Sequence, residues 1–116
     1  MSDSTLDRVP VVGGLAYIER VRRLPSAFTA VLQTEPENRY FRHAIAVMVG
    51  GEKVGYVAPE IARRYYDAIR AMGRSISCPG RSARHTDHET SGVESLLDFR
   101  PLAGMESIDS DPTVSK

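Results

Sequence analysis

The segment from Val31 to Ala62 constrains the fold most, because each break in its apolar pattern has a separate physical cause. Pro36 fixes its own φ angle and lacks an N–H, so the apolar run before it ends in a turn. The pair Gly50-Gly51 supplies the positive φ angles that a tight hairpin needs. Pro59 suits the first position of a helix, where no N–H is required. The segment therefore predicts strand, turn, strand, hairpin, strand and helix, in that order.

Hydrophobic periodicity extends this prediction to the rest of the chain. We expect strands over 9–24 with a bend at Gly13-Gly14, and over 27–34, 44–49, 53–58, 75–83 with an interruption at Pro79-Gly80, and 92–99. A polar loop is expected over 84–91 and one helix over 59–72, with Ile61, Tyr65, Ile69 and Met72 on its apolar stripe. About six short strands and one helix predict a mainly β (α+β) fold, with a mainly antiparallel sheet curled into a small barrel.

The length of 116 residues suits a single domain. We expect a disordered lead over 1–8, a folded body over 9–100 and an acidic, disordered tail over 101–116. The sequence shows neither an apolar run long enough to span a membrane nor the pattern of a secretory signal. A single cysteine, Cys78, cannot form an internal disulfide, so we expect a cytoplasmic protein.

The formal net charge is zero, but the charges are unevenly distributed along the chain. Residues 19–84 carry twelve basic and six acidic side chains, a balance of +6. Residues 85–116 carry two basic and seven acidic side chains, a balance of −5, and residues 1–18 contribute −1. A positive body with an acidic tail suits a polyanionic partner. A solvated surface of mixed charge is the alternative interpretation.

Aromatic and basic side chains gather near the first bend, the central turn and the hairpin. The members of this set are Tyr17, Arg39, Tyr40, Phe41, Arg42, His43, Lys53 and Tyr56. Proteins that bind single-stranded nucleic acid combine a positive groove with rings on which bases stack. The alternative is that Phe41 and Tyr56 pack in the core while the arginines are solvated. We expect Phe41 to belong to the core and Tyr40 to be available for binding.

Several short motifs occur in a characteristic order. They are Val-Val-Gly (11–13), Glu-Pro-Glu-Asn-Arg-Tyr (35–40) with Ala-Ile-Ala-Val (44–47), Val-Gly-Tyr-Val (54–57) with Pro-Glu-Ile-Ala (59–62), and Gly-Val-Glu-Ser-Leu-Leu-Asp-Phe (92–99). In this order the chain resembles the HIRAN domain family, a small β-rich module found alone in bacteria and fused to helicase-like DNA-repair ATPases. The resemblance covers residues 9–100 and implies an OB-like barrel.

The resemblance also implies a DNA site. In HIRAN domains that hold single-stranded DNA, some at a free 3′ end, an aromatic residue after Val-Val-Gly and the tyrosine of an Asn-Pro-Tyr-Asp turn contact the terminal nucleotide. Asn38 and Tyr40 match that turn, and Tyr17 matches an aromatic residue after Val-Val-Gly. Arg39 replaces the Pro of the turn, and Phe41 replaces its Asp, the group suited to accept a hydrogen bond from a 3′-OH. The match therefore favours binding along a strand over capture of its end.

These observations predict a nucleic-acid-binding module for single-stranded or frayed DNA in a repair or replication context. We expect stacking on Tyr17 and Tyr40 and phosphate contacts from Arg39, Arg42 and Lys53, while the predicted site also includes Asn38 and Tyr56. A protein partner such as a helicase or a nuclease fits this role. The alternative function is a protein-interaction or regulatory adaptor that binds no nucleic acid.

We predict no catalytic, metal or cofactor site, no enzyme activity and no membrane partner. The segment His85-Thr86-Asp87-His88-Glu89 has metal-capable side chains, but they are adjacent in one loop, whereas a metal site needs three or four converging ligands. A lone Cys78 on a strand is more often a small buried hydrophobe than a nucleophile. Neither glycine pair has the spacing of a phosphate-binding loop.

Overall fold

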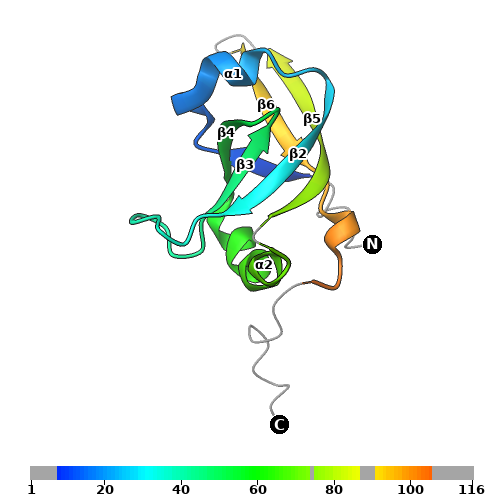
Figure 1. Ribbon diagram of the computed structural model, residues 1–116. Coiled ribbons are helices and arrows are strands. Elements are labelled where there is room, and N and C mark those ends of the chain that lie inside the picture. The colour runs from blue at the N-terminus through cyan, green and yellow to red at the C-terminus, as the bar shows by residue number, and fades with distance from the viewer. Residues whose placement is uncertain (1–7, 74, 87–90, 106–116) are drawn as a thin grey trace.

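The computed structural model describes residues 8–73, 75–86 and 91–105. Within them six strands close into an antiparallel barrel in the order β1-β4-β3-β2-β5-β6, and β6 pairs back with β1 (Figure 1). The strands are β1 (Val9–Val12), β2 (Ala27–Thr34), β3 (Ile45–Val49), β4 (Glu52–Val57), β5 (Ser75–Thr86) and β6 (Ser91–Leu97). This closed barrel with one main helix confirms the predicted mainly β fold.

The alternation of side chains along the strands builds the core. In β2, which matches the predicted strand over 27–34, Ala30, Leu32 and Thr34 are buried and the side chains between them are exposed. In β3, three successive residues from Ile45 to Val47 are all buried. The strand is therefore covered on both faces, as its mixture of small and branched residues indicated.

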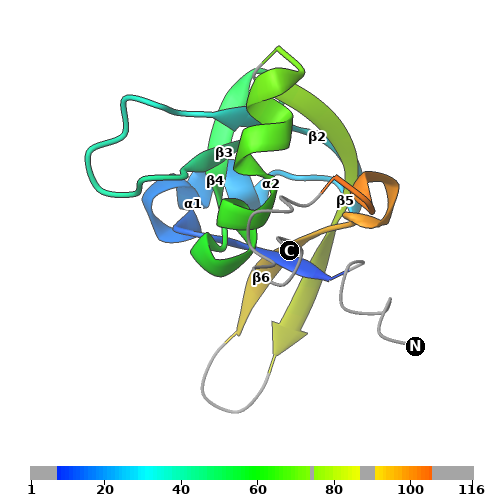
Figure 2. The same cartoon turned by 90° about the horizontal axis from the view of Figure 1, so that it is seen from below.

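Helix α2 (Pro59–Ala71) lies across one end of the barrel (Figures 1 and 2). It buries Ala62, Tyr65, Tyr66 and Ile69 against the core. The predicted apolar stripe is wrong at its last residue: the helix ends at Ala71, and Met72 is 56% exposed. Tyr66 is buried instead, and its ring lies edge-on to the ring of His43, with centroids 5.2 Å apart. The middle of α2 thereby contacts the loop that follows β2.

The predicted strand over 9–24 is also wrong, since β1 ends at Val12. Gly13 has a φ of 76°, a left-handed conformation that turns the chain out of the sheet. A 3-10 turn, η2 (Gly14–Tyr17), and a short helix, α1 (Ile18–Arg22), follow it. Val21 of α1 is buried in the core, so the apolar residues of this segment follow a helical and not an alternating period.

Strand β5 runs unbroken through Pro79-Gly80, where an interruption was predicted. Phe28 of β2 pairs with Gly80, and its ring occupies the space in which a Cβ of Gly80 would lie. The ring thus replaces the missing side chain and stabilises the strand at this glycine. The predicted loop over 84–91 is shorter, because β5 continues to Thr86 and β6 begins at Ser91; residues 87–90 lie outside the described part.

The described chain continues past the predicted body through a short 3-10 turn, η3 (Arg100–Leu102). Leu102 is buried in the core, and Phe99 packs edge-on against Tyr65 with ring centroids 4.9 Å apart. Residues 1–7 of the predicted lead and 106–116 of the predicted tail lie outside the described residues. Among the described helices, none has the length and apolar character needed to cross a membrane.

Candidate functional site

A cavity of about 360 Å³ opens between the end of β1, the loop of residues 35–44, the end of β4 and the start of α2. Its walls include the rings of Tyr40, Phe41 and Tyr56, and we call it the aromatic cavity. This volume lies within the ~300–1,000 Å³ range of small-ligand pockets. The cavity is therefore large enough to receive a planar group.

The 35–44 loop is shaped by Asn38. Its backbone N–H donates to the carbonyl oxygen of Glu35 at 3.0 Å, which closes a turn. Its side-chain Oδ1 accepts hydrogen bonds from the backbone N–H groups of Tyr40 (2.8 Å) and Phe41 (2.9 Å). Asn often stabilises turns through such bonds to nearby backbone. As a result the loop holds the side chains of Tyr40 and Phe41 outward, 88% and 46% exposed.

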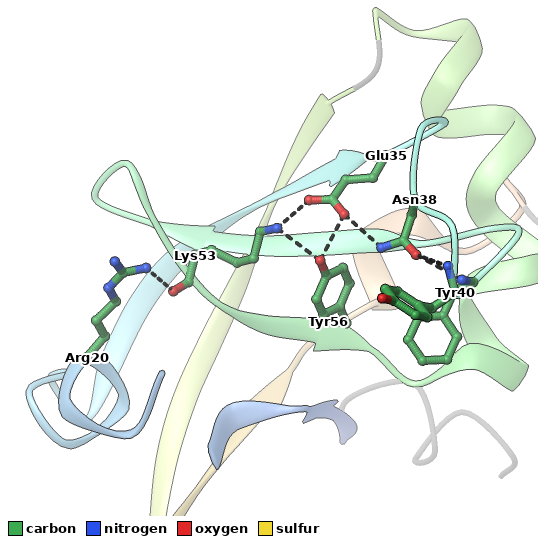
Figure 3. A network of polar contacts seen from close by, with 7 residues as sticks. Arg20, Glu35, Asn38, Tyr40, Lys53 and Tyr56 are labelled. Atoms are coloured by element: carbon green, nitrogen blue, oxygen red, sulfur yellow. Dashed lines mark hydrogen bonds and ion pairs between the residues drawn. The ribbon is translucent and has the colours of Figure 1, made fainter. Parts of the chain in front are cut away.

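Glu35 connects this loop to β4 (Figure 3). Its Oε1 accepts hydrogen bonds from Asn38 Nδ2 at 3.1 Å and from the hydroxyl of Tyr56 at 2.8 Å, and its Oε2 pairs with Lys53 Nζ. Lys53 Nζ also donates to the Tyr56 hydroxyl at 2.9 Å. Four side chains from the loop and from β4 thus form one polar network beside the cavity.

The network changes the acidity of its members. Partial burial raises the pKa of Glu35, but hydrogen bonds from Lys53, Asn38 and Tyr56 outweigh burial and hold the pKa below its ordinary value. The hydrogen bond to Glu35 is the main reason that the pKa of Lys53 is raised. Burial is the first cause that raises the pKa of Tyr56, and its bond to Glu35 adds to that effect. At neutral pH the network therefore contains a carboxylate, an ammonium and a neutral phenol.

The charge of the aromatic cavity is positive. Among the described residues, Arg42 from the loop and Arg63 from α2 line it, and no carboxylate does. In the described part of the chain, no ion pair or hydrogen bond engages the side chains of Arg42 or Arg63. Glu35 is the nearby acid in the network, and Lys53 balances its charge. Rings and unengaged guanidinium groups around one cavity suit a ligand with a flat group and a negative charge.

The family model described as HIRAN domain matches residues 9–94. The chain belongs to the HIRAN domain family. HIRAN domains are in general DNA-binding modules. No curated protein and no solved structure matches the chain.

The HIRAN fold brings five of the seven predicted site residues to the aromatic cavity and its polar network. Tyr40, Arg42 and Tyr56 line the aromatic cavity, and Asn38 fixes the loop behind them. The structure places Phe41 on the cavity wall and 46% exposed, so its predicted place in the core is wrong. The Asn38 turn is the reason, because it directs residues 40 and 41 away from the barrel. Arg39 is exposed on the same loop but does not line the cavity.

Of the other predicted residues, Tyr17 lies elsewhere and Lys53 belongs to the polar network beside the cavity. Tyr17 lines a separate hollow formed by residues 16–20, where the Arg20 guanidinium lies 5.5 Å from the ring centroid. Arg20 also donates to the carbonyl oxygen of Lys53 at 2.8 Å, which links α1 to β4 (Figure 3). The helix α1 and the 35–44 loop lie on the same side of the barrel (Figures 1 and 2). Lys53 was expected to contact a phosphate. In the structure its ammonium group pairs with Glu35 and donates a hydrogen bond to Tyr56.

Sequence reasoning missed Glu35 and Arg63. Glu35 lies 18 residues from Lys53 and 21 from Tyr56, and no local spacing rule links them. Arg63 stands in the first turns of a helix that was predicted, but its proximity to the loop follows only from the fold. The sequence signal for Glu35 is indirect: this residue precedes Pro36 and directly follows the strand expected over 27–34.

The predictions on metal and thiol chemistry concern other parts of the molecule. The described residues contain no group of three or more His, Cys, Asp or Glu side chains placed to hold a metal ion, and 87–89 lie outside them. Cys78 is buried in β5, and burial, together with the charge of Asp98, raises the pKa of its thiol to about 12. A thiol with such a pKa is a weak nucleophile at neutral pH.

Proposed function

We propose that this HIRAN domain binds single-stranded or frayed DNA and that the aromatic cavity receives one base of the strand. One observation carries the proposal: the rings of three side chains and the guanidinium groups of two arginines surround one cavity. Within the described part of the chain, no carboxylate lines this cavity and no side chain pairs with those arginines. Base stacking on an aromatic side chain contributes ~1–3 kcal/mol per base. A duplex presents its bases already stacked, whereas a single strand or a frayed end presents them free.

The charges of the site support a nucleic acid over an apolar partner. Arg42 and Arg63 lie at the cavity, and Arg39 is exposed on the same loop. A guanidinium group donates two parallel hydrogen bonds to a phosphate, so a nucleotide whose base lies in the cavity can place its phosphates on these arginines. The role we propose is binding without catalysis, in DNA repair or replication, beside a helicase or nuclease partner.

A protein-interaction adaptor is the second candidate, because Val12, Tyr40 and Phe41 form exposed apolar surface at the cavity. Salt separates the two functions. DNA binding releases counterions, so its affinity falls steeply as salt rises. Apolar docking of a protein segment is strengthened or little changed by salt.

The test is a fluorescence-anisotropy titration with a labelled oligothymidylate of about 12 nucleotides, a length within the range bound by single-strand-binding folds. We expect binding at low salt, weaker binding to a blunt duplex, and loss of affinity in Tyr40→Ala. The fold should tolerate this change, because the Tyr40 side chain is 88% exposed. Absence of binding at low salt, or a Tyr40→Ala variant that binds like the wild type, would refute the proposed site.

A further inference from the structure

Glu35 occupies the base of the 35–44 loop. Its backbone N–H donates to the carbonyl oxygen of Ala44 at 2.9 Å, so the two ends of the loop are joined. Its carboxylate accepts bonds from the loop side through Asn38 and from β4 through Lys53 and Tyr56 (Figure 3). Only an acceptor with two oxygens and no proton satisfies three donors from two directions.

A relay of hydrogen bonds leads from this carboxylate to the cavity walls. Glu35 orients the Asn38 amide so that its nitrogen faces the carboxylate and its oxygen faces the loop. That oxygen then holds the backbone of Tyr40 and Phe41. In the other direction, the bond to the hydroxyl of Tyr56 fixes the ring that forms the facing wall, 6.3 Å from the ring of Phe41 between centroids.

We propose that Glu35 is the positioning residue of the aromatic cavity: it contacts no DNA, and through Asn38 and Tyr56 it sets the rings between which a base is received. The DNA arm of this inference rests on the proposed function. A cavity whose walls are set in advance loses less conformational entropy on binding, and preorganisation of this kind raises affinity. Lys53 balances the carboxylate, so a negative group can be placed beside a DNA site without repelling the strand.

Glu35→Gln changes DNA affinity in opposite directions depending on whether Glu35 acts through its charge alone or by positioning the cavity walls. It removes one negative charge near a polyanion, so electrostatics alone predicts tighter binding. The carbonyl oxygen of an amide accepts at most two hydrogen bonds and its NH2 group accepts none. The new side chain therefore cannot accept from Asn38, Tyr56 and Lys53 together, and the positioning account predicts weaker binding. We expect an oligothymidylate to bind about fivefold more weakly, the effect of losing about one typical hydrogen bond. Unchanged or tighter binding overturns the proposal.

Glu37→Gln is the matched control. Glu37 is exposed on the same loop, and no described residue bonds to its side chain. It loses the same charge two residues away, so we expect binding equal to or slightly tighter than that of the wild type. Were Glu35→Gln to unfold, Asn38→Ala would replace it, since it breaks the relay and keeps the Glu35–Lys53 pair. Asn38→Ala should then weaken binding about fivefold, and wild-type affinity in that variant overturns the proposal.

Exchanging the donor and acceptor roles of residues 35 and 38 should restore DNA affinity. Asn38→Asp alone places two carboxylates at hydrogen-bond distance and should weaken binding at least as much as Glu35→Gln. In the double variant Glu35→Gln/Asn38→Asp the glutamine amide can donate to the new carboxylate, and the formal charge equals that of the wild type. We expect the double variant to bind more tightly than either single variant. Additive losses would contradict a relay between these two side chains.

Hydrogen exchange on the free protein tests the relay without DNA. Glu35→Gln should speed exchange of the Tyr40 and Phe41 amides several-fold and leave the amide of Val47, in the centre of β3, unchanged. If the wild type binds no DNA, the proposed function fails, and this measurement still decides the relay. Equal exchange rates at Tyr40 and Phe41 in both proteins overturn the positioning role.

Discussion

The ring of Phe41 lies 6.3 Å from the ring of Tyr56, measured between centroids, and is tilted by 49°. The two rings come from different segments, the 35–44 loop and β4, and face the same cavity. Because they are tilted and not parallel, they form a corner. A base that stacks on one ring meets the other at its edge, which is a favourable arrangement for aromatic groups.

Phe41→Ala should weaken binding to single-stranded DNA by about 1–3 kcal/mol, because it removes one stacking surface. The same change should lower the free energy of unfolding by only about 0.5 kcal/mol, since the side chain is 46% exposed. Anisotropy titrations and thermal melts measure the two quantities. Met72→Ala, which truncates another exposed apolar side chain away from the cavity, is the control. Equal losses of affinity in both variants would argue against a specific stacking surface.

Arg42→Gln and Arg63→Gln should each reduce the slope of log affinity against log salt by about one, because each removes one phosphate contact. Arg70→Gln is the matched control for Arg63, since both arginines are exposed on α2 and only Arg63 lines the cavity. We expect the slope for Arg70→Gln to match that of the wild type. Identical slopes for Arg63→Gln and Arg70→Gln would show that the salt dependence reflects the net charge of the protein and not a phosphate contact at the cavity.

The Glu35 network should make stability depend on acid. The pKa of Glu35 is lowered in the folded state, so the stability it contributes is present above the ordinary value of 4.5 and is lost as pH falls through the folded value. At neutral pH, Glu35→Gln should lower the free energy of unfolding by about 1–2 kcal/mol. Urea denaturation across this pH range should show the two proteins converging in acid. A constant difference at all pH values would mean that the loss does not come from the charge.

Gly55 should be the most sensitive glycine of the barrel. A Cβ there would lie 2.5 Å from Val11 Cγ1 and 2.7 Å from the carbonyl oxygen of Val12, and backbone of a paired strand cannot move aside. We expect Gly55→Ala to destabilise the fold by about 3 kcal/mol, the upper end of overpacking effects. Gly50→Ala meets no atom within 4 Å and should cost about 1 kcal/mol for its left-handed φ of 61°. Denaturant midpoints decide the ranking, and a milder Gly55→Ala would contradict the close approach of β1 and β4.

Much of the barrel could be predicted because alternation, helix starts and turn residues are visible in short stretches of sequence. β2 alternates strictly, and α2 begins at Pro59 and presents an apolar stripe. Ala16, Tyr17 and Ile18 are compatible with a strand and with a helix, so the sequence pattern alone predicted a strand after Gly13. The left-handed φ angle of Gly13 turns the chain out of the sheet, and a helical segment follows. At Pro79-Gly80 the strand continues because the ring of Phe28 fills the space beside Gly80, and that contact comes from another strand.

The site was less predictable than the fold. Motif order and composition indicated the 35–44 loop, and Tyr40 and Arg42 lie at the cavity as expected. The roles of Phe41 and Lys53 depended on hydrogen bonds that cross the fold: Asn38 directs Phe41 outward, and Glu35 holds Lys53. Such partners are set by tertiary structure, so a single sequence does not reveal them.

The most direct test of the central claim is an amide chemical-shift titration of the protein with single-stranded oligothymidylate. If the aromatic cavity receives a base, the largest shifts should occur at Tyr40, Phe41 and Arg42, at Tyr56 on β4, and at Arg63 on α2. Residues of the β2–β5 pair such as Thr29 and Ser77 should not shift. Shifts centred on that pair, or none at saturating DNA and low salt, would contradict the account.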